Sequence, residues 1–198
     1  MSSAKKLNLI SIDDYLSGEL ISAIKHEYLG GVVYAMAGAR NSHNIIATNI
    51  LGSLHGRLRG RRCRPYNSDT KIRVLLPYQT RFYYPDTSVV CAPNSQEQSY
   101  QDSPVVIFEV LSRSTRRIDG GEKKDAYLTI PALAAYVLVE QESTEIVVYR
   151  RAEQGFVREA YEGLAAVIAF PELQTELPLS EIYADVEFAP EPADDEER

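Results

Sequence analysis

Val105-Val106-Ile107-Phe108-Glu109-Val110-Leu111-Ser112 is an apolar run with the composition of a buried β-strand and a single carboxylate inside it. Burying an ionised carboxylate in such a strand is costly unless it pairs with a cation. Glu109 is therefore the most informative residue of the chain. Two interpretations follow: Glu109 forms an ion pair with a buried arginine or lysine, or it binds a metal ion.

A second carboxylate, Asp86, precedes another β-prone run, Thr87-Ser88-Val89-Val90, 23 residues before Glu109. Carboxylates on adjacent strands of one sheet can face the same side and hold a divalent cation through oxygen ligands, as Mg²⁺ prefers. The sequence thus predicts a site for Mg²⁺ or Mn²⁺ at Asp86 and Glu109. A Pro-Asp turn at the start of a strand is the alternative explanation of Asp86.

Asp119, Lys123 and Tyr127 stand four residues apart in residues 119–130, a segment with helical periodicity that ends before Pro131. On a helix these three side chains share one face. Lys123 can then point at the two acids and supply positive charge to a transition state, while Lys124 faces solvent. The alternative is a surface pair between Asp119 and Lys123, with Tyr127 in the core.

The remaining patterns predict short strands and a few helices. Ser11 and Asp14 fit the capping box of a short helix, and Gly30-Gly31 joins a hairpin of residues 26–29 and 32–36 that carries Glu27. Residues 42–58 form an amphipathic helix, and residues 179–183 form a short one. Further strands are expected at residues 70–76, 83–92, 105–111, 135–139, 146–149, 156–161 and 165–170. The predicted fold class is α/β (or α+β), a mixed sheet flanked by helices with added hairpins.

Length and composition point to one domain. The 198 residues are 44% apolar, which predicts a single domain over residues 1–188 and an acidic, disordered tail over residues 189–198. No stretch approaches the roughly 18 apolar residues of a membrane span, and no signal peptide is evident. These patterns favour a cytoplasmic protein without membrane contact, in which Cys63 and Cys91 are reduced thiols.

The formal charge of −7 counts against a nucleic-acid partner, but its distribution matters more. The tail from Glu191 holds five acids and one arginine, which leaves a charge near −3 on the rest of the chain. Basic residues gather in two runs: Arg57, Arg59, Arg61, Arg62 and Arg64, and then Arg113, Arg116, Arg117, Lys123 and Lys124. Such runs are either solvated faces or contacts to a phosphate backbone.

Taken in order, these motifs resemble a known family. They include His26-Glu27-Tyr28-Leu29-Gly30-Gly31-Val32-Val33-Tyr34-Ala35-Met36, His43, Tyr84-Pro85-Asp86-Thr87, Glu109-Val110-Leu111-Ser112-Arg113-Ser114-Thr115, and Asp119-Gly120-Gly121-Glu122-Lys123 with Tyr127. The chain is similar to the Uma-like branch of the PD-(D/E)XK nuclease superfamily, whose members are restriction endonuclease-like. The resemblance implies a restriction-endonuclease-like sheet core, with Asp86, Glu109 and the Val110 carbonyl as metal ligands.

The resemblance also departs from the superfamily pattern at one position. The superfamily lysine lies two residues after the glutamate, where this chain has Leu111, so the family would place it on the following helix as Lys123. Glu27 matches an acidic position that binds a second metal or orients water, or else it forms a salt bridge at the hairpin end. His43 matches a helical histidine, or it is a polar residue of the helix N-terminus. Ser112, Asp119 and Tyr127 are accessory candidates.

The function predicted from these residues is metal-dependent hydrolysis of phosphodiester bonds in DNA. A homodimer is compatible with cutting two strands. A non-catalytic nucleic-acid-binding or assembly module that keeps the nuclease fold is a second hypothesis, favoured by the net negative charge. Hydrolysis of small phosphoesters by the same acids is a third, because the chemistry does not fix the size of the substrate.

Overall fold

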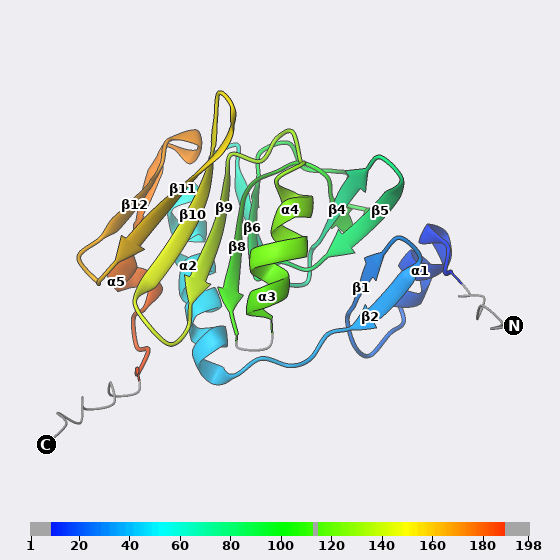
Figure 1. Cartoon of the computed structure of the whole chain (residues 1–198), viewed down its shortest axis with the longest axis horizontal. Helices are drawn as coiled ribbons and strands as arrows, with labels where there is room; N and C mark the ends of the chain where they lie inside the picture. Colours follow the sequence, from blue (N-terminus) through cyan, green and yellow to red (C-terminus); the bar gives the residue numbers. More distant parts are fainter. Residues whose placement is uncertain (1–8, 113–114, 189–198) are drawn as a thin grey trace, which may run out of the picture.

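A computed structural model describes residues 9–112 and 115–188 and shows a mixed α/β fold in which three sheets lie side by side (Figure 1). The central six-stranded sheet has the order β11-β10-β9-β8-β6-β3. Its strands are β3 (Arg64–Asn67), β6 (Thr87–Val90), β8 (Pro104–Leu111), β9 (Ala135–Glu140), β10 (Glu145–Ala152) and β11 (Gly155–Glu162). Only β8 and β9 run parallel in it, so the sheet is mixed, as predicted.

A five-stranded sheet of order β2-β1-β5-β4-β7 and a two-stranded hairpin lie beside the central sheet. The strands are β1 (His26–Leu29), β2 (Val32–Ala35), β4 (Lys71–Leu76), β5 (Gln79–Tyr83) and β7 (Tyr100–Gln101), with β12 (Val167–Phe170) and β13 (Thr175–Pro178) in the hairpin. The predicted hairpin of β1 and β2 is confirmed. It turns at Gly30 and Gly31, both of which have positive φ, a conformation that glycine adopts at little cost.

Helices cover both faces of the central sheet. α1 (Ile12–Glu19) begins at Ser11, whose hydroxyl accepts a hydrogen bond from the N–H of Asp14, as the capping pattern predicts. The amphipathic helix of residues 42–58 is confirmed as α2 (Asn41–Leu58). α2 packs Ile46, Ile50 and Leu54 against one face of the sheet. α4 (Lys124–Tyr127) packs on the other face, and α5 (Leu179–Ile182) follows β13.

Two predicted elements are broken where the site forms. The strand expected at residues 83–92 is split between two sheets, because β5 ends at Tyr83 and β6 begins at Thr87. The helix expected at residues 119–130 is α3 (Arg116–Ile118), a π-helical turn (Asp119–Lys123) and α4. Gly121, with φ of −118° and ψ of −105°, interrupts this segment. β3, β7, β13 and the 3-10 turn Pro171–Leu173 were not predicted from the sequence, and neither was β5 apart from its last residue, Tyr83.

The prediction of two reduced thiols is wrong, because Cys63 and Cys91 form a disulfide. The two residues continue the antiparallel register of β3 and β6, in which Arg64 lies opposite Val90. They therefore face each other across the strand pair, which their sequence separation of 28 conceals. None of the described helices is long and apolar enough to cross a membrane. The tail at residues 189–198 lies outside the described residues, and the single domain over residues 1–188 stays a prediction.

Candidate active site

Glu109 occupies an otherwise apolar face of β8. Side chains two residues apart on a strand share a face, and the neighbours on this face, Ile107 and Leu111, belong to a core cluster with Tyr127. Only 5% of the Glu109 side chain is exposed. The fold therefore places a carboxylate where the alternation of the strand calls for an apolar side chain.

The partner of Glu109 is Lys123, which is equally buried. The Lys123 Nζ atom lies 3.0 Å from Glu109 Oε1, 3.1 Å from Glu27 Oε1 and 3.6 Å from Asp119 Oδ1. The Oε1 atoms of Glu27 and Glu109 are buried, and neither accepts a well-aligned hydrogen bond from a described group. One ammonium thus serves three carboxylates without satisfying all of their oxygens.

The kinked helix brings Lys123 to this cluster. Asp119 and Lys123 begin and end the π-helical turn that contains Gly121, and both side chains are buried. Single π turns inside helices are frequent at functional sites. The turn keeps Lys123 on the side of Asp119, as the four-residue spacing predicted, although the segment is not a regular helix.

Asp86 reaches the same region from the segment between β5 and β6. Its Oδ2 atom accepts a hydrogen bond from the Val110 N–H at 2.7 Å, and its Oδ1 atom lies 2.9 Å from His43 Nε2. Thr87 is the first residue of β6 and lies opposite Phe108 of β8. Val110 therefore lies beyond the last residue pair of β6 and β8, and its N–H can donate to the Asp86 carboxylate. Asp86 is fixed beside Glu109 in this way, and His43 holds it from α2.

Burial and neighbouring charges shift the pKa values of this cluster. Burial raises the pKa of Glu109 well above its ordinary value, Lys123 opposes that rise, and the charges of Asp119 and Asp86 add to it. Burial likewise raises the pKa of Asp119. Burial alone would lower the pKa of Lys123, but the carboxylates of Glu109, Glu27 and Asp119 outweigh it and raise that pKa. The lysine stays charged, and the surplus of carboxylates favours either a bound proton or a further cation.

The donor set suits a hard divalent cation better than a zinc ion, because it consists of carboxylate oxygens without a cysteine. In the described parts of the chain, no three side chains of His, Cys, Asp or Glu are arranged to hold a metal ion. Mg²⁺ nonetheless often binds through one or two carboxylates and keeps several waters. Asp86, Glu109 and a main-chain oxygen could hold it in that manner.

Comparison with known proteins identifies the family. Residues 12–181, which include every candidate residue above, match the family model Uma2, described as "Putative restriction endonuclease". This chain belongs to the Uma2 family. The resemblance noted in the sequence is thereby confirmed at the level of the family.

Two proteins of Synechocystis sp. resemble this Uma2 chain. The uncharacterized protein slr1290 is 35% identical over 148 residues, which are 74% of this chain and 76% of that protein. The uncharacterized protein sll1609 is 29% identical over 136 residues, 67% of this chain and 76% of that protein. A crystal structure from Anabaena variabilis, described as "a putative nuclease belonging to DUF820", matches with a TM-score of 0.70, 16% identity and coverage of 88% of this chain and 97% of the other. This structure shows that the two proteins share a fold.

Other predicted site residues of the Uma2 chain have structural contacts. Ser112 and Thr115 exchange hydrogen bonds between their hydroxyl and N–H groups just before α3. Tyr127 is buried against Tyr83 and Tyr136, and burial together with Glu109 raises its pKa.

Lys124 points away from the acids, but the prediction that it faces solvent is wrong. Its ammonium lies 5.2 Å from the centre of the Tyr149 ring, and the side chain is half-buried.

Two aromatic residues of the site were missed in the sequence. Tyr83 places its ring 5.6 Å from the Lys123 ammonium, and Arg81 donates a hydrogen bond to its hydroxyl. The Tyr136 hydroxyl donates a hydrogen bond to the Asp119 carbonyl at 2.9 Å. Both tyrosines come from runs with the composition of ordinary strands, so no motif distinguished them.

The structure divides the predicted basic runs. Arg57 pairs with Glu181, Arg61 donates to the Leu173 and Gln174 carbonyls, and Arg62 donates to the Cys91 carbonyl. In the second run Arg116 pairs with Glu140, and Arg113 lies outside the described residues. The side chains of Arg59, Arg64 and Arg117 are exposed and make no ion pair or hydrogen bond within the described ranges. The cationic surface available to a partner is therefore smaller than the sequence suggested.

Proposed function

We propose that this Uma2-family protein is a divalent-metal-dependent endonuclease that hydrolyses phosphodiester bonds in DNA. The observation that carries the proposal is the buried cluster in which Lys123 lies 3.0 Å from Glu109 while Asp86 is fixed next to that acid through the Val110 N–H. A purely structural pair would need one acid for one lysine. A cluster with a surplus of carboxylates suits chemistry that adds positive charge when substrate and metal bind.

The proposal includes a PD-(D/E)XK interpretation of the fold. Asp86 and Glu109 would be the two acids of the pattern, and Leu111 occupies the usual place of the lysine. Lys123 enters from the π-helical turn instead, and its ammonium reaches Glu109. The proximity of these groups supports the idea that the lysine moved along the chain while its position in space was kept.

In this proposal Asp86, Glu109 and the Val110 carbonyl would hold Mg²⁺ or Mn²⁺. A divalent cation at such a site lowers the pKa of water and neutralises charge on the phosphate. Hydrolysis then adds water across one P–O bond and gives a phosphate monoester and an alcohol. Because the site is buried and the surrounding side chains are fixed, its charges need little reorganisation during the reaction.

The other residues would position these groups. Lys123 would donate to a phosphate oxygen on which charge develops, and Glu27 and Asp119 hold its ammonium in place. His43 would orient Asp86 through the contact of 2.9 Å to Oδ1. Glu27, which contacts Lys123 at 3.1 Å, would also orient the attacking water.

A nicking assay tests the proposal. Purified protein should convert supercoiled plasmid to nicked or linear DNA with Mg²⁺ or Mn²⁺ and not with EDTA. Asp86→Asn and Glu109→Gln should each abolish this activity, whereas Glu153→Gln, in an exposed turn between β10 and β11, should not. Equal activity of all three variants would reject the proposed site.

A second candidate function is a nucleic-acid-binding or assembly module without catalysis. It is favoured by the ion pairs of Lys123 with Glu109 and Glu27, which partly balance the buried acids without a metal ion. Salt-sensitive DNA binding without cleavage under either metal would support this module and reject the enzyme.

A further inference from the structure

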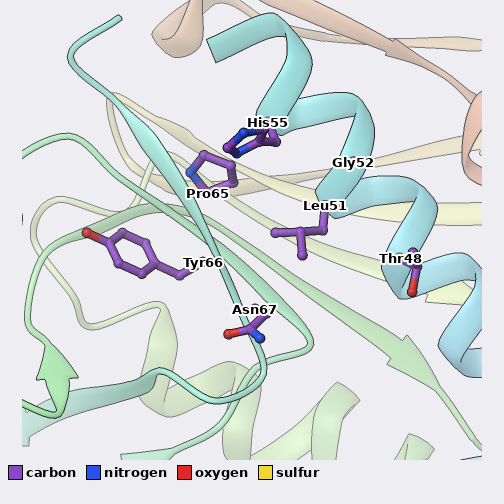
Figure 2. Close-up of a pocket in the computed structure, with 7 residues that line it drawn as sticks. All are labelled: Thr48, Leu51, Gly52, His55, Pro65, Tyr66 and Asn67. Atoms are coloured by element: carbon purple, nitrogen blue, oxygen red, sulfur yellow. The ribbon is translucent and has the colours of Figure 1, made fainter. Parts of the chain in front are cut away.

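A hollow of about 430 Å³ lies between α2 and β3, apart from the carboxylate cluster (Figure 2). Its volume lies within the range of roughly 300–1,000 Å³ found for ligand pockets. The helix wall consists of Thr48, Leu51, Gly52 and His55, which recur at helical spacing. These residues lie away from the face that α2 buries against the sheet. The strand wall consists of Pro65, Tyr66 and Asn67 on the edge strand of the central sheet.

Both walls of the hollow begin at the candidate active site. His43, on the first turn of α2, contacts Asp86 and precedes Thr48 by little more than one helical turn. On the strand side, Asn67 lies directly opposite Thr87, the residue that follows Asp86. A chain held in the hollow would therefore continue toward the carboxylates.

The charge at the far end of the hollow suits a polyanion. The seven lining residues include no acid. Arg59 follows His55 by one helical turn, so it lies at the end of the helix wall. Its side chain is exposed and makes no ion pair or hydrogen bond with a described group, unlike that of Arg57. Arg64 lies on the opposite side of β3 from Pro65, because side chains alternate along a strand, and it lines a separate hollow with Asp69.

The composition of the lining suits the face of a nucleobase. Leu51, Pro65 and His55 offer apolar and aromatic surface, and Gly52 leaves the helix backbone open. Bases that stack on aromatic side chains, beside cations that contact the phosphates, are the common mode of single-strand binding. Bases of an intact duplex are already stacked and paired, so a base must leave the duplex to enter a pocket.

We propose that the hollow between α2 and β3 binds an unpaired nucleotide of the strand that leads to the carboxylate cluster, with Arg59 contacting its phosphate. This inference rests on the proposed nuclease function and specifies its substrate. The substrate is nucleic acid with a single-stranded segment next to the scissile bond, rather than an uninterrupted duplex.

Two glycines of α2 give a matched test. A Cβ atom added at Gly52 or Gly56 meets nothing within 4 Å, so both positions accept a larger residue without disturbing the helix. Only Gly52 lines the hollow. Gly52→Leu should fill the hollow, and Gly56→Leu serves as its control. Arg59→Gln has a control in Arg158→Gln, because Arg158 is exposed on β11, at the edge of the central sheet opposite β3.

The measurement is equilibrium binding of a fluorescent 12-nucleotide DNA strand to the full chain in EDTA. We expect Gly52→Leu to weaken binding about tenfold, as for the loss of one stacked base. Arg59→Gln should make the negative slope of log K against log salt shallower by about 0.7, the value for one phosphate contact on a single strand. Both controls should match the wild type.

The inference is overturned if Gly52→Leu and Arg59→Gln bind the strand as the wild type does, which would also be the result if the hollow binds a peptide. It is also overturned if each control variant loses as much binding affinity as the variant with which it is matched. A plasmid assay with Mg²⁺ separates this inference from the proposed function. Loss of single-strand binding in Gly52→Leu without any cleavage by the wild type would support the hollow and reject the nuclease. Unimpaired cleavage and binding by Gly52→Leu would support the nuclease and reject the hollow as a nucleotide site.

Discussion

The ammonium of Lys123 lies 3.0 Å from the carboxylate of Glu109, and both side chains are about 95% buried. Breaking a buried pair by removing one partner is strongly destabilising, by roughly 3–5 kcal/mol, because an uncompensated charge remains. The pair is therefore important to the fold of this Uma2 protein whatever its catalytic role. Tests of catalysis must separate the two contributions.

The first prediction compares two adjacent lysines. Lys123→Ala should lower the single-turnover rate of DNA cleavage about a hundredfold or more, the scale for loss of one fixed electrostatic donor. Lys124→Ala should have little effect, because Lys124 packs over Tyr149 away from the acids. Rates are measured at saturating metal, at a temperature where circular dichroism shows both variants folded. A larger loss at Lys124 would show that Lys123 is not the catalytic lysine.

The second prediction concerns His43, which contacts Asp86 but not the other acids. His43→Ala should reduce cleavage about tenfold to a hundredfold, the usual effect of removing a residue that orients a metal ligand. The Val110 N–H still holds Asp86 in this variant, so some activity should remain. Raising the metal concentration should recover part of the rate. A full loss without any metal dependence would indicate a direct catalytic role.

The sequence predicted the elements of this fold better than their interruptions. Helical periodicity located α2, and the continuous apolar run of β8 located Glu109, because both signals are local. The split of one predicted strand between β5 and β6 was missed, although Pro85 lies within it, because Tyr83 and Thr87 both favour strands. The kink at Gly121 was missed because a helical pattern with two glycines still looks helical.

Only some of the contacts between distant segments could be predicted from the sequence. The pairing of Lys123 with Glu109 could be anticipated, since a buried acid requires a cation and the spacing of Asp119 and Lys123 placed one nearby. The Val110 N–H as a partner of Asp86 could not, because it depends on where β6 begins. The internal partners of Arg57 and Arg61 lie more than 100 residues away, so a basic run gave no sign of them.

The third prediction concerns the disulfide between Cys63, just before β3, and Cys91, just after β6. The two cysteines are 28 positions apart, and the loop that they close contains β3 to β6. The double variant Cys63→Ser and Cys91→Ser should lose about 3–4 kcal/mol of unfolding free energy, because the cross-link restricts the unfolded chain. Urea denaturation measures this loss, and dithiothreitol should lower the stability of the wild type alone. Equal stability of both proteins in oxidising buffer would contradict a disulfide in solution.

The fourth prediction tests metal binding without catalysis. If Mg²⁺ binds the folded protein and not the unfolded chain, it should raise the unfolding free energy by about 2.7 kcal/mol at a concentration one hundred times its Kd. Asp86→Asn should abolish the rise in Tm, whereas Glu153→Gln should retain it. Differential scanning calorimetry with Mg²⁺ and with EDTA provides the comparison. A rise of equal size in Asp86→Asn would place the metal elsewhere.

The last prediction follows from the pKa of Glu109, which burial raises well above its ordinary value of 4.5. A raised pKa means that the folded protein binds this proton more tightly than the unfolded chain does. The resulting stabilisation is complete below about pH 4.5 and is lost as pH rises through the raised pKa, at a rate of up to about 1.4 kcal/mol per pH unit. Glu109→Gln has no such proton, so in EDTA its unfolding free energy should fall less between pH 5 and pH 8 than that of the wild type. Urea denaturation across this range measures both profiles, with Glu153→Gln expected to follow the wild type. Parallel profiles for wild type and Glu109→Gln would mean that Lys123 keeps Glu109 fully ionised, and the carboxylate surplus would then have to be neutralised at Asp119.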